Sequence, residues 1–496
     1  MTDKPREACG VFGIHAGTHG VSPAIDVSRI TFFGLYALQH RGQESAGIVT
    51  SNGNYLNAYK RMGLVAQVFT EEDLAVLRGN IAIGHVRYST TGSSRICNAQ
   101  PFLMNTPEGQ FALAHNGNLV NFADLRAELE KGSGEFETTT DSEIIARLIA
   151  RAPGTTWVER IQHSMAQIEG AYSLVMLTRD SLIGIRDPLG VRPLCLGKLN
   201  GSWVLSSESC ALDTVGADFV REIEPGEIVV IDSDGFHSYV GRVSQRRAMC
   251  VFEYIYFARP DSTINNKLVY MTRREMGRQL AREHPADADL VIAVPDSAMP
   301  GGMGYAQELG LPFAEGLVKN RYIGRTFIQP DQHLREVGIN LKFNPLPEVL
   351  AGKRVVVVDD SIVRGNTTRP IVRLLRRAGA REVHVRIHCP PQRNPCYFGV
   401  DLAKRSELIA ARMTIPETCE YIEADSLGYL SLTGLVAATQ VASGNLCNGC
   451  FTGRYPIVVQ AERDRLGGES SQPDSLVGAE ATAVRQRRPV PVTAGE

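Results

Sequence analysis

The chain has 496 residues, of which 43% are hydrophobic and 21% are charged, and its formal net charge is -2. This length allows two or three domains, and the balanced charge gives no reason to expect a nucleic acid or a membrane as partner. No apolar run approaches the roughly 20 residues that cross a bilayer, the polar start carries no signal-peptide core, and 10 cysteines do not form a disulfide framework in a chain of this size. We therefore expect a cytoplasmic protein with reduced thiols.

The N-terminal half opens on a polar leader, residues 1–8, followed by a run that is typical of a strand. If the leader is removed as a propeptide, Cys9 gains a free α-amino group. Such a group has a pKa of about 7.7–8.0, which lets it act as the base for the thiol of its own residue. The competing interpretation is a small buried cysteine in an edge strand, and the residues by themselves leave both open.

Five motifs further along this half favour the nucleophile over the structural cysteine. They occupy residues 38–47, 84–92, 115–118, 140–143 and 186–193. In this order they resemble the glutaminase domain of the N-terminal-nucleophile amidotransferases. The resemblance implies an αββα sandwich over residues 9–240, with Cys9 attacking the side-chain amide of glutamine. It also implies an oxyanion hole formed by Asn116 and the backbone N–H of Gly117. The implied glutamine-binding residues are Arg87, Thr90 and Asp141. Taken singly, residues 115–118 also make a good turn and Arg87 a surface ion pair.

The C-terminal half contains four consecutive valines, residues 355–358, which are typical of a strand buried on both faces of a parallel sheet. Asp359 and Asp360 follow, then a polar turn with Gly365, and then a segment from Pro370 with helical spacing of its apolar residues. A strand, turn and helix in this order place backbone N–H groups around an anion. The paired acids favour a sugar diol or a hydrated Mg²⁺ ion, although an ordinary βα unit with solvated acids has the same outline.

This stretch resembles the loop of the phosphoribosyltransferases that binds 5-phosphoribosyl-1-diphosphate (PRPP). The resemblance implies a parallel-sheet α/β domain over residues 250–466 and one Mg²⁺ per subunit at Ser297, Asp359 and Asp360. The implied PRPP contacts are Asp359, Asp360, Ser361, Val363, Arg364, Gly365, Asn366 and Thr367, together with Lys319 and Arg321 from a mobile loop that closes over the substrate. Ser297 as a simple helix cap and a merely basic surface loop are the alternatives.

Two cysteines, Cys447 and Cys450, form a C-x-x-C pair, which is ambiguous between zinc, iron–sulfur and redox chemistry. Residues 250–262 resemble the start of the synthase domain in glutamine PRPP amidotransferases. Within that family, the chain is identified with the iron–sulfur-containing, propeptide-processed branch, which implies one four-iron, four-sulfur cluster per subunit on Cys250, Cys396, Cys447 and Cys450. A structural zinc or free thiols remain the alternative.

The resemblance as a whole implies a two-domain α/β enzyme that transfers ammonia from glutamine to PRPP, with purine nucleotides as feedback inhibitors and a homotetrameric assembly. Other glutamine-dependent synthases, making glucosamine phosphate or asparagine, share the glutaminase but would not need the PRPP loop. A PRPP-binding transcriptional regulator with an inactive glutaminase domain is the alternative from a different class. Residues 467–496 are rich in Gly, Ser, Pro, Glu and Thr, and we expect a disordered tail there.

Overall fold

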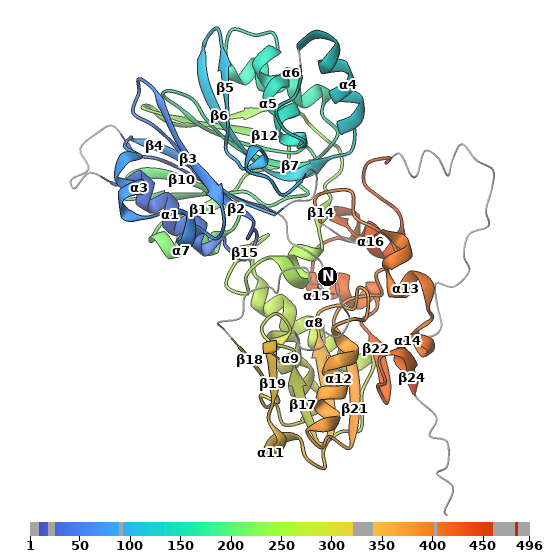
Figure 1. Ribbon diagram of the computed structural model, residues 1–496. Coiled ribbons are helices and arrows are strands. Elements are labelled where there is room, and N and C mark those ends of the chain that lie inside the picture. The colour runs from blue at the N-terminus through green and yellow to red at the C-terminus, as the bar shows by residue number, and fades with distance from the viewer. Residues whose placement is uncertain are drawn as a thin grey trace, which may run out of the picture.

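The computed structural model describes residues 9–17, 25–88, 93–133, 135–320, 341–400, 404–459 and 482–484. The leader, Thr90, Arg321, most of the loop that carries Arg321 and most of the tail lie outside these residues. Two domains follow one another along the chain; the N-terminal one, blue to green, lies above the C-terminal one, yellow-green to red, in Figure 1. No helix in the described residues is long and apolar enough to cross a membrane.

The N-terminal domain is built on two antiparallel sheets. The first has the order β11 (Asp218–Glu222), β9 (Cys195–Leu199), β10 (Ser202–Ser206), β1 (Gly10–His15), β4 (Ile81–Arg87), β2 (Ser45–Ser51) and β3 (Leu56–Met62). The second has the order β13 (Gly235–Val240), β12 (Glu227–Asp232), β8 (Leu182–Arg186), β7 (Gly170–Leu177), β6 (Gly109–Leu119) and β5 (Phe102–Thr106), with η1 (Ile96–Asn98) just before it. Helices α1 (Val27–Ala37), α2 (Val65–Val68), α3 (Glu71–Val76) and α7 (Ser209–Val215) cover the first sheet, and α4 (Phe122–Ser133), α5 (Asp141–Arg151) and α6 (Trp157–Gln167) the second.

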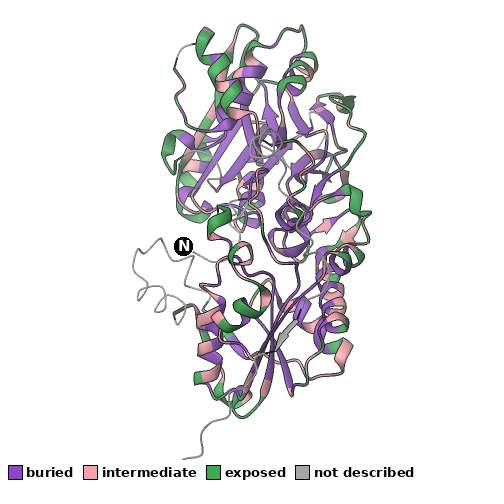
Figure 2. Ribbon diagram, turned by 90° about the vertical axis from the view of Figure 1, so that its right-hand side faces the viewer, coloured by how far each residue is buried: buried purple, intermediate pink, exposed green. Residues whose placement is uncertain are grey.

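Three apolar layers hold this sandwich together. Val11 and Val175 belong to the layer between the two sheets, Phe12 to the layer under α1, and Ile145 to the layer under α5. Because both faces of the central strands are covered, strand β1 is buried along its whole length, as the purple strands of Figure 2 show. The predicted αββα arrangement is confirmed.

The C-terminal domain has a sheet in the order β17 (Leu290–Ala293), β20 (Arg354–Asp359), β21 (Glu382–Ile387), β22 (Ser426–Tyr429) and β24 (Thr482–Val484). The first four strands are parallel. The longer helices are α8 (Val269–Glu283), α9 (Met299–Leu309), α12 (Thr368–Arg377), α14 (Ile415–Tyr421) and α15 (Leu432–Thr439). The short elements are β14 (Met249–Cys250), the π-helical turn η2 (Glu253–Phe257), β15 (Thr263–Ile264), β16 (Lys267–Leu268), β18 (Leu317–Lys319), β19 (Phe343–Pro345), α11 (Pro347–Leu350), η3 (Arg405–Glu407), α13 (Ile409–Arg412), η4 (Ser443–Asn445), β23 (Leu446–Cys447) and α16 (Gly449–Thr452).

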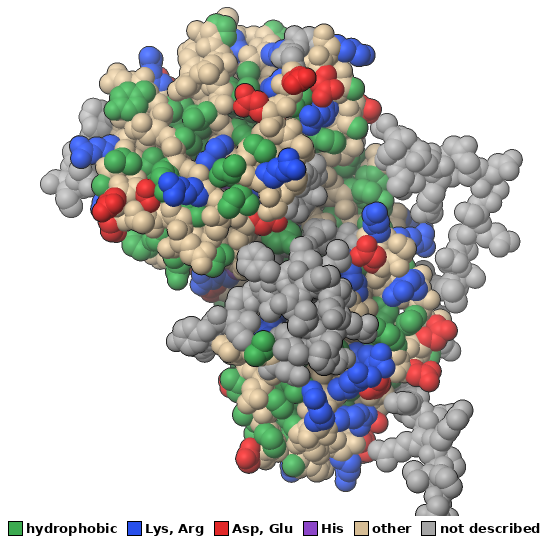
Figure 3. All heavy atoms as spheres, viewed as in Figure 1, with side chains coloured by type: hydrophobic (Ala, Val, Ile, Leu, Met, Phe, Trp, Pro, Cys, Tyr) green, Lys and Arg blue, Asp and Glu red, His purple; other side chains and the backbone are tan. Residues whose placement is uncertain are grey.

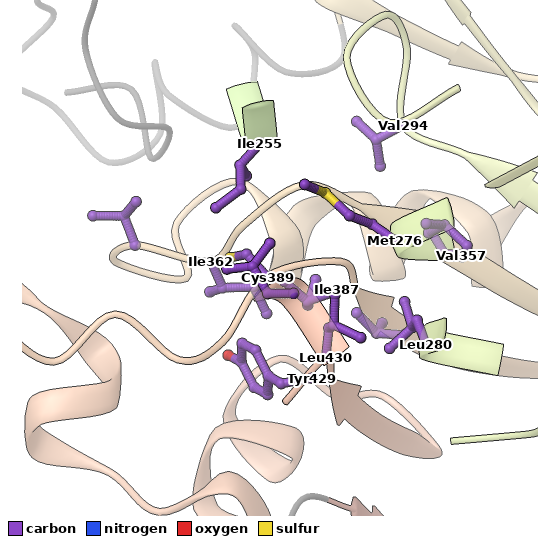
Figure 4. Packing of buried hydrophobic residues seen from close by; sticks show 14 of the residues in the cluster. Ile255, Met276, Leu280, Val294, Val357, Ile362, Ile387, Cys389, Tyr429 and Leu430 are labelled. Carbon is purple, nitrogen blue, oxygen red and sulfur yellow. The ribbon is translucent and has the colours of Figure 1, made fainter. Parts of the chain in front are cut away.

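The valine run forms the centre of this sheet, as predicted. Val355–Val358 pair with β17 on one side and β21 on the other, and Val357 packs in the same core as Ile387 and Leu280 (Figure 4). Helix α12 buries Ile371, Val372, Leu374 and Leu375 on one face. Basic side chains gather over the same helix on the solvent side (Figure 3), so the helical spacing predicted from Pro370 onward is confirmed.

Thr482–Val484, in the segment expected to be disordered, instead form the antiparallel edge strand β24 on β22. Two of the three residues, Thr482 and Val484, are β-branched and suit a strand. The two domains also share one apolar core, because Ala171, Leu189 and Val191 of the N-terminal domain pack in the same cluster as the C-terminal sheet.

Candidate active sites

Cys9 immediately precedes β1 and is only 7% exposed. Its Sγ lies 3.4 Å from the carbonyl oxygen of Tyr88 and 3.5 Å from the Tyr88 backbone N. Burial raises the pKa of the Cys9 thiol, although the contact with Tyr88 and the charge of Arg87 partly oppose that rise. A nearby base is therefore needed to make this thiol nucleophilic at neutral pH.

Two buried histidines, on strands β4 and β6 of the two facing sheets, are poorly suited to be that base. Burial lowers the pKa of His85 to about 3, and it lowers the pKa of His115 as well. The Nε2 of His85 contacts the carbonyl oxygen of His115 at 3.0 Å, and the Nδ1 of His115 lies 3.0 Å from the Ser142 hydroxyl. The lowered pKa makes each ring a weak base at neutral pH.

Asn116 and Gly117 lie side by side on β6, which contacts β1 across the sandwich. The Asn116 side chain is fully buried, and neither its nitrogen nor its oxygen has a hydrogen-bond partner among the described residues. Leaving a buried polar group unpaired costs about 1–3 kcal/mol, so an unpaired carboxamide indicates a ligand. Gly117 has a φ of +153°, and a Cβ there would lie 2.0 Å from the carbonyl oxygen of Ala171, so only glycine fits.

Arg87 and Asp141 place opposite charges near Cys9, because each affects the pKa of its thiol. Arg87 ends β4, and its Nη1 lies 3.2 Å from an Oε2 of Glu44 and 3.3 Å from the carbonyl oxygen of Ser93. Asp141 is the first residue of α5, and its Oδ2 accepts from the Leu119 N–H at 2.9 Å. A guanidinium and a carboxylate flanking a thiol match the α-carboxylate and α-ammonium of an amino acid. Sequence reasoning did not single out Glu44.

The second site lies at the carboxyl end of β20, where an open α/β sheet binds its ligands. Asp359 and Asp360 are both buried. The Ser297 hydroxyl donates to Asp360, the Ser361 hydroxyl donates to the other carboxylate oxygen at 2.7 Å, and the Asp360 N–H donates to Asp359 at 2.9 Å. The three residues predicted for Mg²⁺ thus meet, with the hard oxygen donors that this ion prefers.

Contacts with residues 407–409 hold the loop after these acids in place. Gly365 has a φ of +80°, and a Cβ there would lie 2.8 Å from Cδ1 of Ile409. The Ile409 N–H donates to the Val363 carbonyl at 2.8 Å, and Arg364 forms a 2.8 Å ion pair with Glu407. Residues 361–367 therefore curve tightly in front of the α12 N-terminus, where backbone N–H groups attract a phosphate.

Lys319, the last residue of β18, forms an ion pair with Asp296, which follows β17. The Lys319 side chain therefore reaches the segment after β17 that also contains Ser297. Arg321, predicted to act with it, lies outside the described residues.

Four cysteines come together where the domains meet. Cys250 on β14 is the parallel pairing partner of Cys447 on β23, and Cys396 and Cys450 are close enough to influence their ionisation. Burial raises the pKa of Cys250 to about 12, with Arg192 opposing the rise. The set matches in number and type the four thiolates that hold a four-iron cluster. In the described residues no group of three or more His, Cys, Asp or Glu is arranged to hold a metal ion.

A buried ion cluster that the sequence did not reveal joins the two domains. Arg41 forms an ion pair with Glu208 and another, at 2.8 Å, with Glu253. Arg192 forms a 3.1 Å ion pair with the same Glu253, and all four side chains are at most 1% exposed. Despite burial, His40 and Arg41 lower the pKa of Glu208 well below its usual range. The one local signal in the sequence was Glu253, a charged residue within the otherwise apolar run of residues 250–257.

Comparisons with known proteins agree with this division. A family of glutamine amidotransferase domains matches residues 85–214, and a family of phosphoribosyl transferase domains matches residues 263–404. The amidophosphoribosyltransferase of Synechocystis sp. is 54% identical, covering 92% of each chain.

Two solved structures match over most of their length. The glutamine PRPP amidotransferase of B. subtilis in complex with ADP and GMP has a TM-score of 0.84 at 44% identity, covering 90% of this chain and 97% of that one. A structure described as the allosteric regulatory enzyme of purine biosynthesis has a TM-score of 0.85 at 44% identity, covering 90% and 96%.

Proposed function

The chain belongs to the amidophosphoribosyltransferase family, whose members catalyse the first step of purine biosynthesis, and from this premise we propose how its residues divide the reaction. Cys9 and its neighbours release ammonia from glutamine, and residues 359–367 bind PRPP for the transfer. The observation that carries the proposal is the buried Cys9 thiol beside the opposite charges of Arg87 and Asp141. This family membership leaves no support for the alternatives, which were a PRPP-binding transcriptional regulator and a synthase of glucosamine phosphate or asparagine.

At the first site, the α-amino group of Cys9 takes the thiol proton once residues 1–8 have been removed. The sulfur then attacks the amide carbon of glutamine, and the oxyanion accepts hydrogen bonds from Asn116 Nδ2 and the Gly117 N–H. Collapse of this intermediate expels ammonia, with the proton returned to the leaving nitrogen. Water hydrolyses the γ-glutamyl thioester to glutamate. Losing one oxyanion donor costs roughly 10²–10³ in rate in comparable sites.

At the second site, ammonia attacks the anomeric carbon of PRPP as the bond to diphosphate breaks, giving 5-phosphoribosylamine. No side chain needs to act as nucleophile, so binding and orientation are the work of the protein. The 361–367 loop holds the 5-phosphate with backbone N–H groups, and Asp359 and Asp360 hold the ribose hydroxyls. A Mg²⁺ ion held by these acids and Ser297 would offset the charge of the leaving diphosphate. Lys319 and Arg321 close over the substrate and exclude water.

The proposals for a metal cluster, for regulatory nucleotides and for the oligomeric state rest on the cysteines present and on similarity to the relatives. Cys250, Cys396, Cys447 and Cys450 would hold a four-iron, four-sulfur cluster, which suits a reducing cytosolic setting. The B. subtilis relative was solved with ADP and GMP, and this supports purine nucleotides as feedback inhibitors here. A homotetramer follows from the family resemblance.

The division of labour is tested with glutamine labelled with ¹⁵N at the amide and an excess of unlabelled ammonium. We expect phosphoribosylamine to carry ¹⁵N undiluted, because the ammonia passes inside the protein to the second site. Product labelled in proportion to the free ammonium pool would contradict internal transfer.

The cluster and the propeptide are tested on protein purified without oxygen. We expect N-terminal sequencing to begin at Cys9, and iron and sulfide assays to give about four of each per chain. A chain that retains Met1 and contains zinc or no metal would overturn both assignments while leaving the PRPP site untouched.

A further inference from the structure

A segment of the C-terminal domain, residues 397–399, lies against the strand that carries the proposed oxyanion hole. Gly399 has a φ of +93°, and a Cβ there would lie 2.8 Å from the carbonyl carbon and 2.9 Å from the carbonyl oxygen of Gly117. Distances below 3.0 Å leave no space for any side chain. The backbone of one domain therefore rests directly on the Gly117 carbonyl group of the other.

Hydrogen bonds to the two residues before Gly399 fix this contact. Asn118, next to Gly117, donates from Nδ2 to the Tyr397 carbonyl at 2.9 Å. Arg192 donates to the Phe398 carbonyl from Nε at 3.0 Å and from Nη2 at 2.7 Å. Charge-assisted bonds of this kind in a buried place are strong and directional. Residues 397–399 are thus held against β6.

The same segment is anchored within its own domain. The Phe398 N–H lies 3.4 Å from Sγ of Cys396, and the Tyr455 hydroxyl donates to the Pro395 carbonyl at 2.6 Å. The Tyr455 ring also packs edge-on against the rings of Tyr397 and Phe398, with centroids 5.0 and 6.1 Å away. The segment is a fixed support rather than a loose loop.

Glu253 connects this support to the nucleophile. One of its oxygens binds Arg192 at 3.1 Å and Arg41 at 2.8 Å, and the other binds Arg41 at 3.0 Å. Arg41 in turn donates from Nε to the carbonyl of Cys9 at 3.2 Å. A single carboxylate of the C-terminal domain therefore joins the guanidinium that holds Phe398 to the one that holds the Cys9 backbone.

We propose that Gly399 and Glu253 are positioning residues for glutamine hydrolysis, because Gly399 supports the Gly117 backbone at its carbonyl and Glu253 acts through Arg41 on the Cys9 backbone, which keeps Gly117 and Cys9 at the spacing that the oxyanion requires. The inference rests on the proposed oxyanion role of Asn116 and Gly117. Oxyanion donors act at 2.7–3.1 Å from the developing charge, and a displacement of about 1 Å costs on the order of 10² in rate. The C-terminal domain thus completes the glutaminase site of the N-terminal domain.

The test compares Gly399→Ala with Gly352→Ala in the full-length enzyme. Gly352 also has a positive φ, +73°, but nothing lies within 4 Å of its Cβ position, so this variant reproduces the backbone cost without the collision. We expect Gly399→Ala to lower the kcat of glutamine hydrolysis by 10- to 100-fold, with the KM for glutamine within about threefold and ammonium-dependent synthesis retained. Gly352→Ala should leave all three values near wild type.

An inhibitor gives a readout that a general loss of stability would not move. The Cys9 thiol adds to the aldehyde analogue of glutamine: a C–S bond forms and the thiol proton goes to the aldehyde oxygen. The product imitates the tetrahedral intermediate. We expect Gly399→Ala to weaken this inhibitor about as much as it lowers kcat, while glutamine binding changes little. Equal weakening of inhibitor and glutamine would overturn the positioning role.

Two further variants decide the remaining cases. If Gly399→Ala fails to fold, Asn118→Ala, which removes the bond to the Tyr397 carbonyl along with a local 3.3 Å contact to the Leu119 carbonyl, should lower kcat severalfold with the inhibitor shift, and no change would overturn the proposal. Asn116→Ala tests the premise separately. If it abolishes glutamine hydrolysis while Gly399→Ala does not alter it, the inference alone fails; if Asn116→Ala retains full hydrolysis, the oxyanion assignment fails with it.

Discussion

The two sites are built in contrasting ways. The core of the PRPP site lies at the end of one strand, because Asp359, Asp360 and the 361–367 loop follow each other in the chain. Ser297 and Ile409, which contact this stretch from elsewhere in the chain, belong to the same domain. The glutaminase site combines residues from β4, β6 and the start of β1, and residues 397–399 of the other domain press on it. A local site can be recognised as a motif, whereas a composite site depends on contacts between distant segments.

The largest expected effect is at the local site. Asp360→Asn removes a carboxylate that receives Ser297 and Ser361, and we expect synthesis from either nitrogen source to fall by about 10³-fold, several kcal/mol of transition-state stabilisation. Glutamine hydrolysis measured alone should persist. The same change at the exposed Asp287 is the control, and equal losses in both variants would contradict a specific role.

Next in size is the stability of the composite site. Glu208→Gln breaks a buried pair with Arg41, and we expect the free energy of unfolding at pH 7 to fall by about 3–5 kcal/mol. Glu71→Gln, which alters an exposed pair with Arg29, should cost about 1 kcal/mol or less. Denaturant titration measures both, and equal costs would contradict the importance of the buried cluster.

The pH dependence of the same residue has a definite sign. Because the folded pKa of Glu208 lies well below its usual range, its contribution to stability is fully present above the unfolded value of about 4.3 and is lost as the pH falls through the folded value. The stability difference between wild type and Glu208→Gln should therefore shrink below about pH 4. A difference that grows on acidification would contradict this assignment.

The smallest effect is expected at the phosphate loop. In Gly365→Ala the positive φ and the contact with Ile409 should shift the 361–367 backbone and raise the KM for PRPP about tenfold. Gly310→Ala is the control, since Gly310 has a φ of +67° with nothing within 4 Å of its Cβ position. A KM unchanged in Gly365→Ala would show that this loop does not bind the 5-phosphate.

The same contrast explains how much could be predicted from the sequence. The valine run of β20 and the amphipathic spacing of α12 are local patterns, and the structure has both where they were expected. The Glu253 bridge is different, because Arg41 and Glu253 are 212 residues apart. Periodicity carries no information about such a pair, nor about the contact of Gly399 with Gly117. Pairing of Thr482–Val484 with β22 also depends on a partner strand that local composition does not show.

The most direct test of the two-site account is the nitrogen-source dependence of Cys9→Ala. Removing the thiol takes away the nucleophile but leaves residues 359–367 intact. The account predicts that phosphoribosylamine formation from glutamine falls by at least about 10³-fold, while formation from ammonium salts stays near the wild-type rate. If a correctly folded Cys9→Ala enzyme still uses glutamine, or loses the ammonium-dependent reaction as well, the assignment of separate chemistry to the two domains is contradicted.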